Sequence, residues 1–75
     1  MKTYQVRDLG ESGALLTNGN KLVDIRKEGS VCWFIFEDFD ECERLSKLFW
    51  FGEFKVNAKD YFDSITKLKS RIFQT

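Results

Sequence analysis

The sequence predicts an α+β fold, a single domain over residues 1–75 in which a small antiparallel sheet packs against two to three helices. Three observations support this fold class. Residues 31–36 form an unbroken apolar run rich in aromatic and β-branched side chains, as in a central strand buried on both faces. A turn-forming segment precedes this run, and apolar residues at helical spacing follow it. Because 75 residues can bury only one core, this strand should lie at its centre.

The N-terminal part predicts a short strand followed by a helix. Residues 1–7 have mixed polarity, which favours a short edge strand. Asp8 is a typical N-cap, and Glu11 three residues later completes the pattern of a capping box. The helix should cover residues 9–18 and end at Gly19, a common helix stop.

This first helix should depend on tertiary packing for its stability. Gly10 and Gly13 each weaken a helix by up to about 1 kcal/mol relative to alanine. Contacts with the rest of the fold must offset that loss. The side chains expected to be buried are Leu9, Leu15 and Leu16.

Residues 21–26 and 31–36 predict an antiparallel β-hairpin that turns at residues 27–30, which include a glycine. In the first strand, Val23 and Ile25 should share one face, and the other face should carry Leu22, Asp24 and Arg26. In the second strand, one face should carry Cys32, Phe34 and Phe36, and the opposite face Val31, Trp33 and Ile35. Both faces of the second strand are apolar. Helices should therefore cover one face. The other face should be covered by the N-terminal helix, by the chain end or by another subunit.

The segment after the hairpin predicts a second helix and a third strand. Asp38 or Asp40 should cap this helix, and Gly52 should end it. Its apolar arc consists of Cys42, Leu45, Leu48 and Phe49. Residues 54–56 are long enough for one short strand added to the hairpin.

A third amphipathic helix is predicted at the C-terminal end. Asn57 should be its N-cap. Its apolar stripe should be Tyr61, Ile65, Leu68 and Ile72, widened by Phe62 and Phe73. Basic residues in its final turns suit the helix dipole.

Composition excludes several functional classes. The chain carries 12 basic and 12 acidic residues, so its net charge does not indicate nucleic acid or an anionic membrane. The N-terminus lacks an apolar signal core and no segment is long enough to span a membrane, which predicts a cytoplasmic protein. Cys32 and Cys42 should be reduced there and buried as small apolar residues. Two cysteines cannot fill a structural zinc site without histidine to complete it, and a Ser–His–Asp triad also requires histidine, so we expect no catalytic residue, metal or cofactor.

An aromatic cluster is the main candidate for binding a protein partner. The candidate partner-binding residues are Trp50, Phe51 and Phe54. Consecutive bulky rings cannot all enter one small core. Either the chain bends to bury them, or some form an exposed apolar patch, which is a typical binding hot spot. Both outcomes are open for Trp50.

Charged segments supply the other candidates. The candidate nucleic-acid-binding residues are Lys67, Lys69 and Arg71. They could contact phosphates while Trp33 or Trp50 stacks on bases, although a solvated helix face is the simpler interpretation. The acidic segment at residues 37–43 is typical of a helix N-terminus, with an acidic docking surface or a divalent-metal site as the functional alternatives.

The order of these elements resembles a family of small domains of unknown function found in phages, prophages and the bacteria that carry them. The resemblance covers nearly the whole chain and is carried by Asp8-Leu9, Ala14-Leu15-Leu16 before Gly19, Asp24-Ile25, Phe34-Ile35-Phe36-Glu37-Asp38, Gly52 with Val56, and Tyr61-Phe62 with Leu68-Lys69. Gly13 and Asn20 depart from the pattern, Asn20 at a position where an apolar strand start is expected. The resemblance implies a phage or mobile-element protein and assigns no catalytic residue.

These observations lead to a small non-enzymatic binding protein as the first hypothesis. It would act on a host protein, as a modulator of host machinery or an inhibitor of a bacterial defence system, and would form a homodimer through its surplus apolar surface. The alternative is a nucleic-acid-binding accessory protein, for DNA or RNA, that uses its basic final helix.

Overall fold

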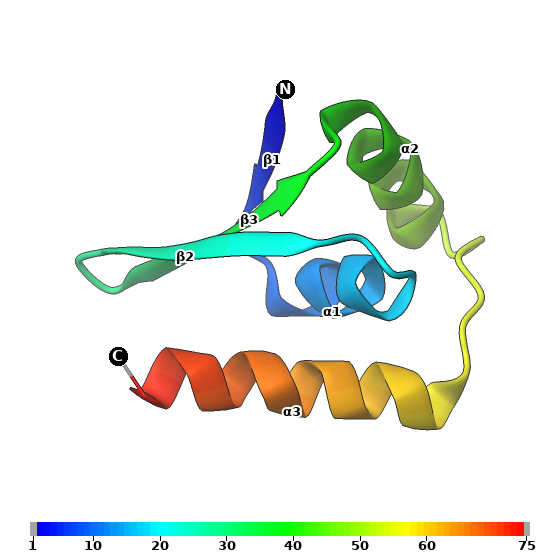
Figure 1. The fold of residues 1–75 in the computed structure, drawn as a ribbon. Helices are drawn as coiled ribbons and strands as arrows, with labels where there is room; N and C mark the ends of the chain where they lie inside the picture. The colour runs from blue at the N-terminus through cyan, green and yellow to red at the C-terminus, as the bar shows by residue number, and fades with distance from the viewer. Residues whose placement is uncertain (1, 75) are drawn as a thin grey trace.

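Three antiparallel strands form the sheet, and the predicted central strand lies between the other two. The computed structural model describes residues 2–74, whose arrangement is shown in Figure 1. In chain order the elements are β1 (Thr3–Val6), α1 (Leu9–Thr17), β2 (Leu22–Glu28), β3 (Val31–Glu37), α2 (Phe39–Trp50) and α3 (Ala58–Gln74). The strand order is β1–β3–β2, so β3 is paired along both edges. The predicted α+β fold class is confirmed.

The third strand of the sheet is β1, the predicted N-terminal edge strand. Residues 53–57 instead connect α2 to α3 without pairing with any strand. The prediction of a strand at residues 54–56 was therefore wrong. The physical reason is that Phe54 and Val56 line a hollow among the helices, so this segment lies beside them and not along an edge of the sheet.

The β2–β3 hairpin is tighter than predicted, because only Gly29 and Ser30 form its loop. Gly29 has a φ of 62°, a left-handed conformation that glycine adopts without strain. A positive φ at the first of two loop residues matches a type II′ turn, which suits the twist of the strands. Near this tip the ammonium of Lys27 donates to the carbonyl of Ile72 at 2.7 Å, which joins the hairpin to the last turn of α3.

A β-bulge at Val23 changes which residues of β2 face the core. The register places Leu22 opposite Phe36 and then continues from Asp24, so Val23 has no partner on β3. Val23 is 42% exposed, whereas Leu22 and Ile25 pack against the core. The prediction that Val23 and Ile25 share a face was wrong, since the extra residue shifts the alternation of side chains by one.

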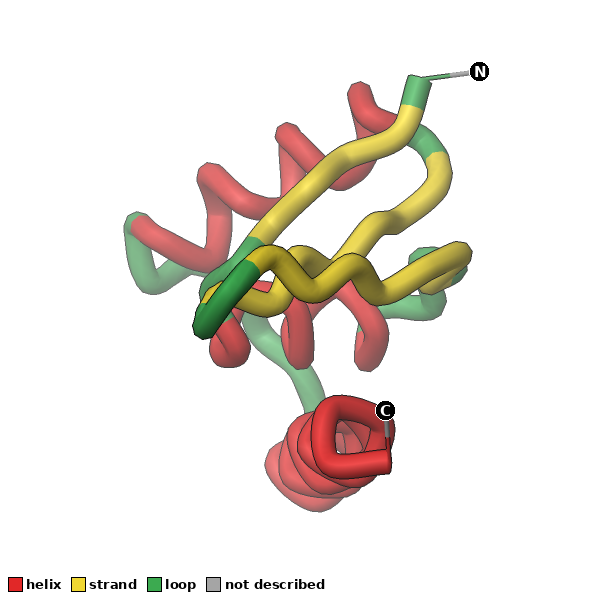
Figure 2. The backbone as a smooth tube through the Cα atoms, turned by 90° about the vertical axis from the view of Figure 1, so that its left-hand side faces the viewer, coloured by secondary structure: helices red, strands yellow, loops and turns green. Residues whose placement is uncertain are grey.

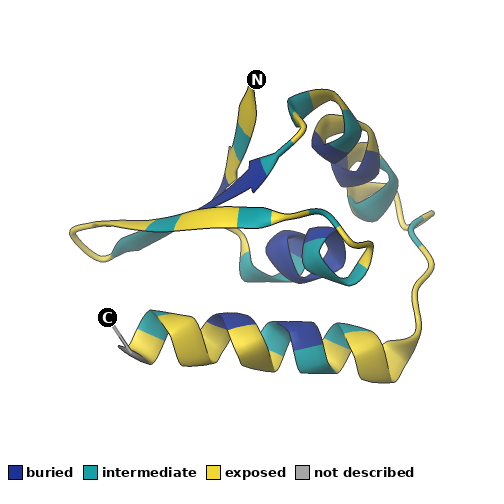
Figure 3. Ribbon diagram, in the orientation of Figure 1, coloured by how far each residue is buried: buried dark blue, intermediate teal, exposed yellow. Residues whose placement is uncertain are grey.

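The core lies on the face of the sheet that carries Phe34 and Phe36. Phe34 is 1% exposed and Phe36 is 0% exposed. Their predicted position on one face is confirmed. Both α1 and α2 pack over this face, and Figure 3 shows the buried residues gathered between these elements. The other members of the buried cluster are Val6, Leu15, Cys42, Leu45 and Leu68.

The helices begin and end at the predicted capping residues. Asp8, Asp38 and Asn57 each accept a hydrogen bond from the amide three residues later, at 2.8, 3.3 and 3.1 Å respectively. Asp38 has a φ of 66°, a left-handed conformation that aspartate tolerates because its short side chain bonds locally. At the opposite ends of α1 and α2, Gly19 and Gly52 take positive φ values of 99° and 75°.

α1 lies between the sheet and α3, which packs on its outer side (Figures 1 and 2). Gly13 permits the close contact, because a Cβ atom there would lie 2.4 Å from Cδ1 and 3.0 Å from Cγ1 of Ile65. One turn earlier, the hydroxyl of Tyr61 donates to the carbonyl of Gly10 at 3.1 Å. The two glycines that weaken α1 as an isolated helix are therefore the residues over which α3 packs.

α3 buries a narrow stripe because it packs mainly against a single helix. Leu68 is fully buried at the centre of the predicted stripe. The half-buried members of the stripe are Tyr61, Ile65 and Ile72. The prediction that Phe62 and Phe73 widen the stripe was wrong, since they are 69% and 85% exposed and lie outside the contact with α1.

The close contact at Gly13 yields a test by double-mutant cycle. Gly13→Ala should lower the free energy of unfolding, because overpacking costs about 1–3 kcal/mol and outweighs a gain of about 1 kcal/mol in helix propensity. In an Ile65→Ala background, where the two clashing carbons are absent, the same change should become stabilising. Denaturant titrations of the four proteins measure this change of sign. An equal effect of Gly13→Ala in both backgrounds would contradict the packing described here.

Candidate functional site

The C-terminal end of α2 exposes two of the three predicted partner-binding residues. Trp50 is 60% exposed and Phe51 is 78% exposed, and we refer to this pair as the aromatic surface. α2 stops here because the amide of Gly52 turns back to the carbonyl of Phe49 at 3.2 Å. Phe54, the third predicted residue, is partly buried against the core. The aromatic cluster is therefore divided between the surface and the interior.

A buried carboxylate holds the indole of Trp50. Glu11 lies in α1 and is only 5% exposed. One of its oxygens, Oε1, accepts a hydrogen bond from Nε1 of Trp50 at 2.9 Å, and Oε2 accepts one from the hydroxyl of Tyr4 at 2.8 Å. A single side chain thus connects β1, α1 and the end of α2. Both oxygens of this carboxylate are satisfied by donors from the chain itself.

The two donors to Glu11 are in turn fixed by neighbouring rings. Tyr4 packs edge-on against Phe39, with ring centroids 5.6 Å apart, and Trp50 packs edge-on against Phe49 at 5.2 Å. Burial, with the carboxylate of Glu11 acting in the same direction, raises the pKa of Tyr4 above its usual value. The Tyr4 hydroxyl therefore remains a proton donor across the physiological range. Trp50 is thus anchored at its indole N–H and packed against Phe49, although most of its surface is open to solvent.

An apolar hollow of about 260 Å³ lies behind the ring on which Trp50 packs. Its walls come from all three helices and from the α2–α3 connection, and its lining residues are Ala14, Phe49, Phe54, Val56 and Tyr61. Val56 at its rim is 37% exposed. The partly buried rings at the end of α2 therefore border a shallow apolar depression.

Glu11 is the residue of this site that sequence reasoning missed. Its place three residues after Asp8 indicated a capping box, but the structure shows only the half in which Asp8 accepts from the Glu11 amide. A signal was nevertheless present: Glu11 is four residues from Leu15, so both share the buried face of α1. An acidic residue on a buried helix face requires hydrogen-bond donors. The aromatic side chains that can donate are those of tryptophan and tyrosine, and the chain has only two of each.

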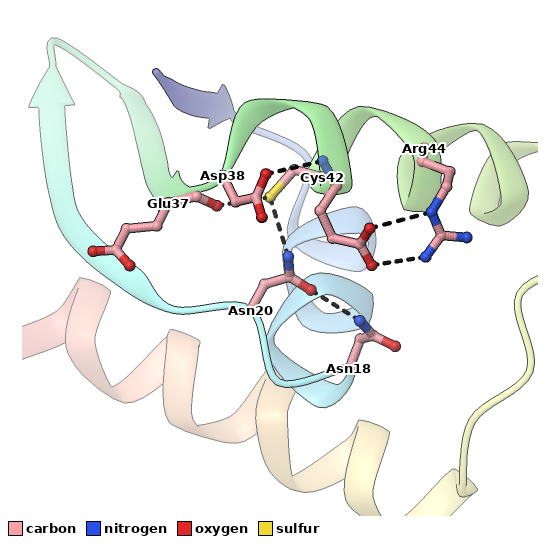
Figure 4. A network of polar contacts seen from close by, with 7 residues as sticks. Asn18, Asn20, Glu37, Asp38, Cys42 and Arg44 are labelled. Atoms are coloured by element: carbon pink, nitrogen blue, oxygen red, sulfur yellow. Dashed lines mark hydrogen bonds and ion pairs between the residues drawn. The ribbon is translucent and has the colours of Figure 1, made fainter. Parts of the chain in front are cut away.

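The acidic start of α2 surrounds a buried thiol (Figure 4). The thiol of Cys42, which is 0% exposed, lies 3.3 Å from the carbonyl of Glu37 and accepts from Nδ2 of Asn20 at 3.4 Å. Burial raises the pKa of Cys42 to about 11, against the effect of the hydrogen bond from Asn20. The thiol is therefore protonated near neutral pH and is a poor nucleophile. Asn20 replaces the expected apolar residue because its amide bridges the α1–β2 connection to this sulfur and to Asn18.

The carboxylates in this acidic segment are directed to separate partners. Asp38 caps α2, and Glu41 pairs with Arg44 at 2.7 Å on the exposed side of the helix. Within residues 2–74, the acidic and cysteine side chains do not converge in any group of three that could hold a metal ion. The segment therefore has the local geometry of a helix start.

The predicted nucleic-acid-binding residues do not all lie in one place. Lys67, Lys69 and Arg71 are all exposed on α3. Lys67 and Arg71 line a groove together with Lys21 from the α1–β2 connection, whereas Lys69 is not among the residues that line it. The structure thus places Lys67 and Arg71 beside Lys21, which was not among the predicted residues.

The helices in the described part of the chain are all too short or too polar to cross a membrane. A family described as "Domain of unknown function (DUF5659)" matches residues 1–74. Comparisons with curated proteins and with solved structures returned no match.

The contact between Glu11 and Trp50 can be tested by substitution. Glu11→Ala leaves the Trp50 indole and the Tyr4 hydroxyl without their acceptor, which should lower the free energy of unfolding by about 1–3 kcal/mol. In a Trp33→Phe background, fluorescence anisotropy decay of Trp50 should also show faster local motion of the indole. Glu43→Ala, which removes an exposed acid from α2, is the control and should change stability by less than about 0.5 kcal/mol. Unchanged motion of Trp50 in the Glu11 variant would show that the carboxylate does not hold the ring.

Proposed function

The chain belongs to the DUF5659 family of domains of unknown function, and we propose that it is a small non-enzymatic binding protein that contacts a protein partner through the aromatic surface. The observation that carries this proposal is Trp50, an indole that is mostly exposed and yet held in a fixed orientation by the buried Glu11. A large exposed ring that is already oriented loses little conformational entropy when it binds. Tryptophan is also among the residues most enriched at binding hot spots.

A purely structural role for Trp50 explains less of this geometry. The indole N–H satisfies Glu11, but an asparagine or serine could supply a donor without exposing an apolar ring. Phe51 beside it is 78% exposed, and its side chain has no polar group that could serve as a donor to Glu11, so its exposure has no such explanation. Two adjacent exposed rings next to an apolar hollow are typical of a surface that a protein partner covers.

The proposal extends to the biological setting. The family resemblance suggests a phage or mobile-element protein, which would act in the cytoplasm of a bacterial host. The partner would then be a host protein, and the chain would modulate host machinery or inhibit a defence system. The balanced charge of the chain supports this choice, because binding through apolar rings does not require a strong overall field.

Matched aromatic substitutions test the aromatic surface. A host protein captured by the tagged chain should be identified, purified and titrated by calorimetry with each variant. Phe51→Ala and Trp50→Ala should weaken binding by tenfold or more, roughly the effect of losing a hot-spot residue of about 2 kcal/mol. Phe73→Ala, which removes a similarly exposed ring near the C-terminal end of α3, should bind like the original protein. Equal affinities for the Phe51 and Phe73 variants would refute the proposed surface.

Self-association is a second part of the proposal and concerns the other face of the sheet. In residues 2–74 the three helices lie on one side of the sheet (Figure 2). Trp33 and Ile35 alternate with Phe34 along β3 and so belong to the opposite face, where Trp33 is half-buried and Ile35 is 9% exposed. A second copy of the chain could cover these residues around a twofold axis. Sedimentation velocity over a wide concentration range should then show a dimer, which Trp33→Arg should dissociate. A monomer at every concentration would remove this part of the proposal and leave the aromatic surface untouched.

A further inference from the structure

A groove of about 390 Å³ lies between α3 and the connection from α1 to β2. Its apolar floor is formed by Leu16, Leu22 and Leu68. Its rim is cationic and carries Lys21, Lys67 and Arg71. Two uncharged polar residues, Asn20 and Ser64, complete the lining, so the groove has no acidic residue in its walls.

The three cations of the groove have no acidic partner among residues 2–74. The ion pairs found there involve Arg26, Arg44 and Lys59, which lie elsewhere. Lys67 and Arg71 are four residues apart on α3, a spacing at which like charges repel and destabilise a helix. An anion bound between them would relieve this repulsion.

The helix dipole does not account for this group of charges. Its effect is confined to the last turn of a helix, and α3 continues to residue 74. Arg71 lies in that turn, but Lys67 is a full turn earlier and Lys21 is not in a helix. The shared feature of the three residues is the groove, not a helix end.

We propose that this groove binds a small phosphate-bearing ligand of about mononucleotide size. The cationic rim would hold the phosphates, with the guanidinium of Arg71 able to form two parallel hydrogen bonds to one phosphate group. The leucine floor would contact the less polar part of the ligand. A volume of about 390 Å³ lies at the lower end of the range for small-molecule sites, which suits one nucleotide.

A neighbouring acidic wall favours a small ligand over a nucleic-acid strand. Asn20 and Lys21 also line a second hollow, whose walls include Glu37, Asp38 and Glu41. A long polyanion leaving the cationic groove on this side would approach those carboxylates, and like charges repel. A single phosphate-bearing molecule confined to the groove avoids this repulsion.

The test measures binding of three probes to the original protein and to two double variants with equal changes in charge. The probes are ATP, inorganic pyrophosphate and a fluorescein-labelled oligothymidine, titrated by calorimetry and by fluorescence anisotropy at low and moderate salt. ATP should bind, with amide shifts in NMR spectra centred on Asn20, Lys21 and Lys67. Lys67→Glu with Arg71→Glu should weaken ATP binding by about tenfold or more. Lys55→Glu with Lys69→Glu has the same change in charge outside the groove and should leave binding unchanged.

Other outcomes would overturn the proposal. Absence of ATP binding, or an equal loss in both double variants, would show that the groove is not a site. Tighter binding of the oligothymidine than of ATP, lost only in the groove variant, would assign the surface to nucleic acid instead. Binding of pyrophosphate as tight as that of ATP would remove the role of the leucine floor. If the groove double variant does not fold by circular dichroism, the single change Lys21→Gln replaces it and should weaken ATP binding by a smaller factor, because it removes one of the three rim charges. Lys21 is exposed and lies outside the helices, so this change should not affect folding.

Discussion

Burial of Phe34 and Phe36 on one face of β3 is the constraint on which the rest of the structure depends. Each ring contributes about 1.5–3 kcal/mol when it is removed from water, a large share of the stability of a chain this small. β3 can bury them only if both of its edges are paired and helices cover that face. β1 and β2 supply the edges, and α1 and α2 supply Leu15, Cys42 and Leu45. The remaining element, α3, packs mainly on the outer side of α1 and adds Leu68 to the buried cluster.

α1 has the most demanding position, because all its sides are in contact with other elements. Leu15 enters the core, Gly13 faces Ile65 of α3, and Glu11 reaches the end of α2. A nine-residue helix with two glycines has little stability of its own, so it forms where these contacts exist. The same arrangement explains how an exposed indole is connected to the interior. Trp50 is held by a carboxylate whose helix is packed between the sheet and α3.

Elements specified by local signals could be predicted from the sequence. The caps Asp8, Asp38 and Asn57 each bond to an amide three residues away, and the glycine of the hairpin loop sets its own backbone conformation. The alternation along β3 also follows from neighbouring residues alone. These features need no knowledge of the rest of the fold.

Features that depend on distant contacts could not be predicted in the same way. A one-residue bulge at Val23 depends on how β2 aligns with β3, and the same sequence is compatible with regular pairing. Phe62 and Phe73 fit a helical stripe, but their burial depends on how wide a surface faces α3. The candidate site shows the same division. Exposure of the rings at the end of α2 was one of two outcomes that the sequence left open, whereas the role of Glu11 requires β1 and α2 to meet over one turn of α1.

The aromatic surface and the groove proposed to bind a phosphate-bearing ligand adjoin opposite ends of α1, which separates them physically. Glu11, in the first turn, holds Trp50, whereas Leu16, near the last turn, lies in the floor of the groove. At about 1.5 Å per residue these positions are roughly 8 Å apart along the helix axis, with the packed Gly13 between them. A rim charge such as that of Lys67 can therefore be changed without disturbing the contacts of Trp50. A ligand in the groove would still affect partner binding if it altered how α3 packs on Gly13, because α1 and α3 line both the groove and the apolar hollow beside the aromatic surface.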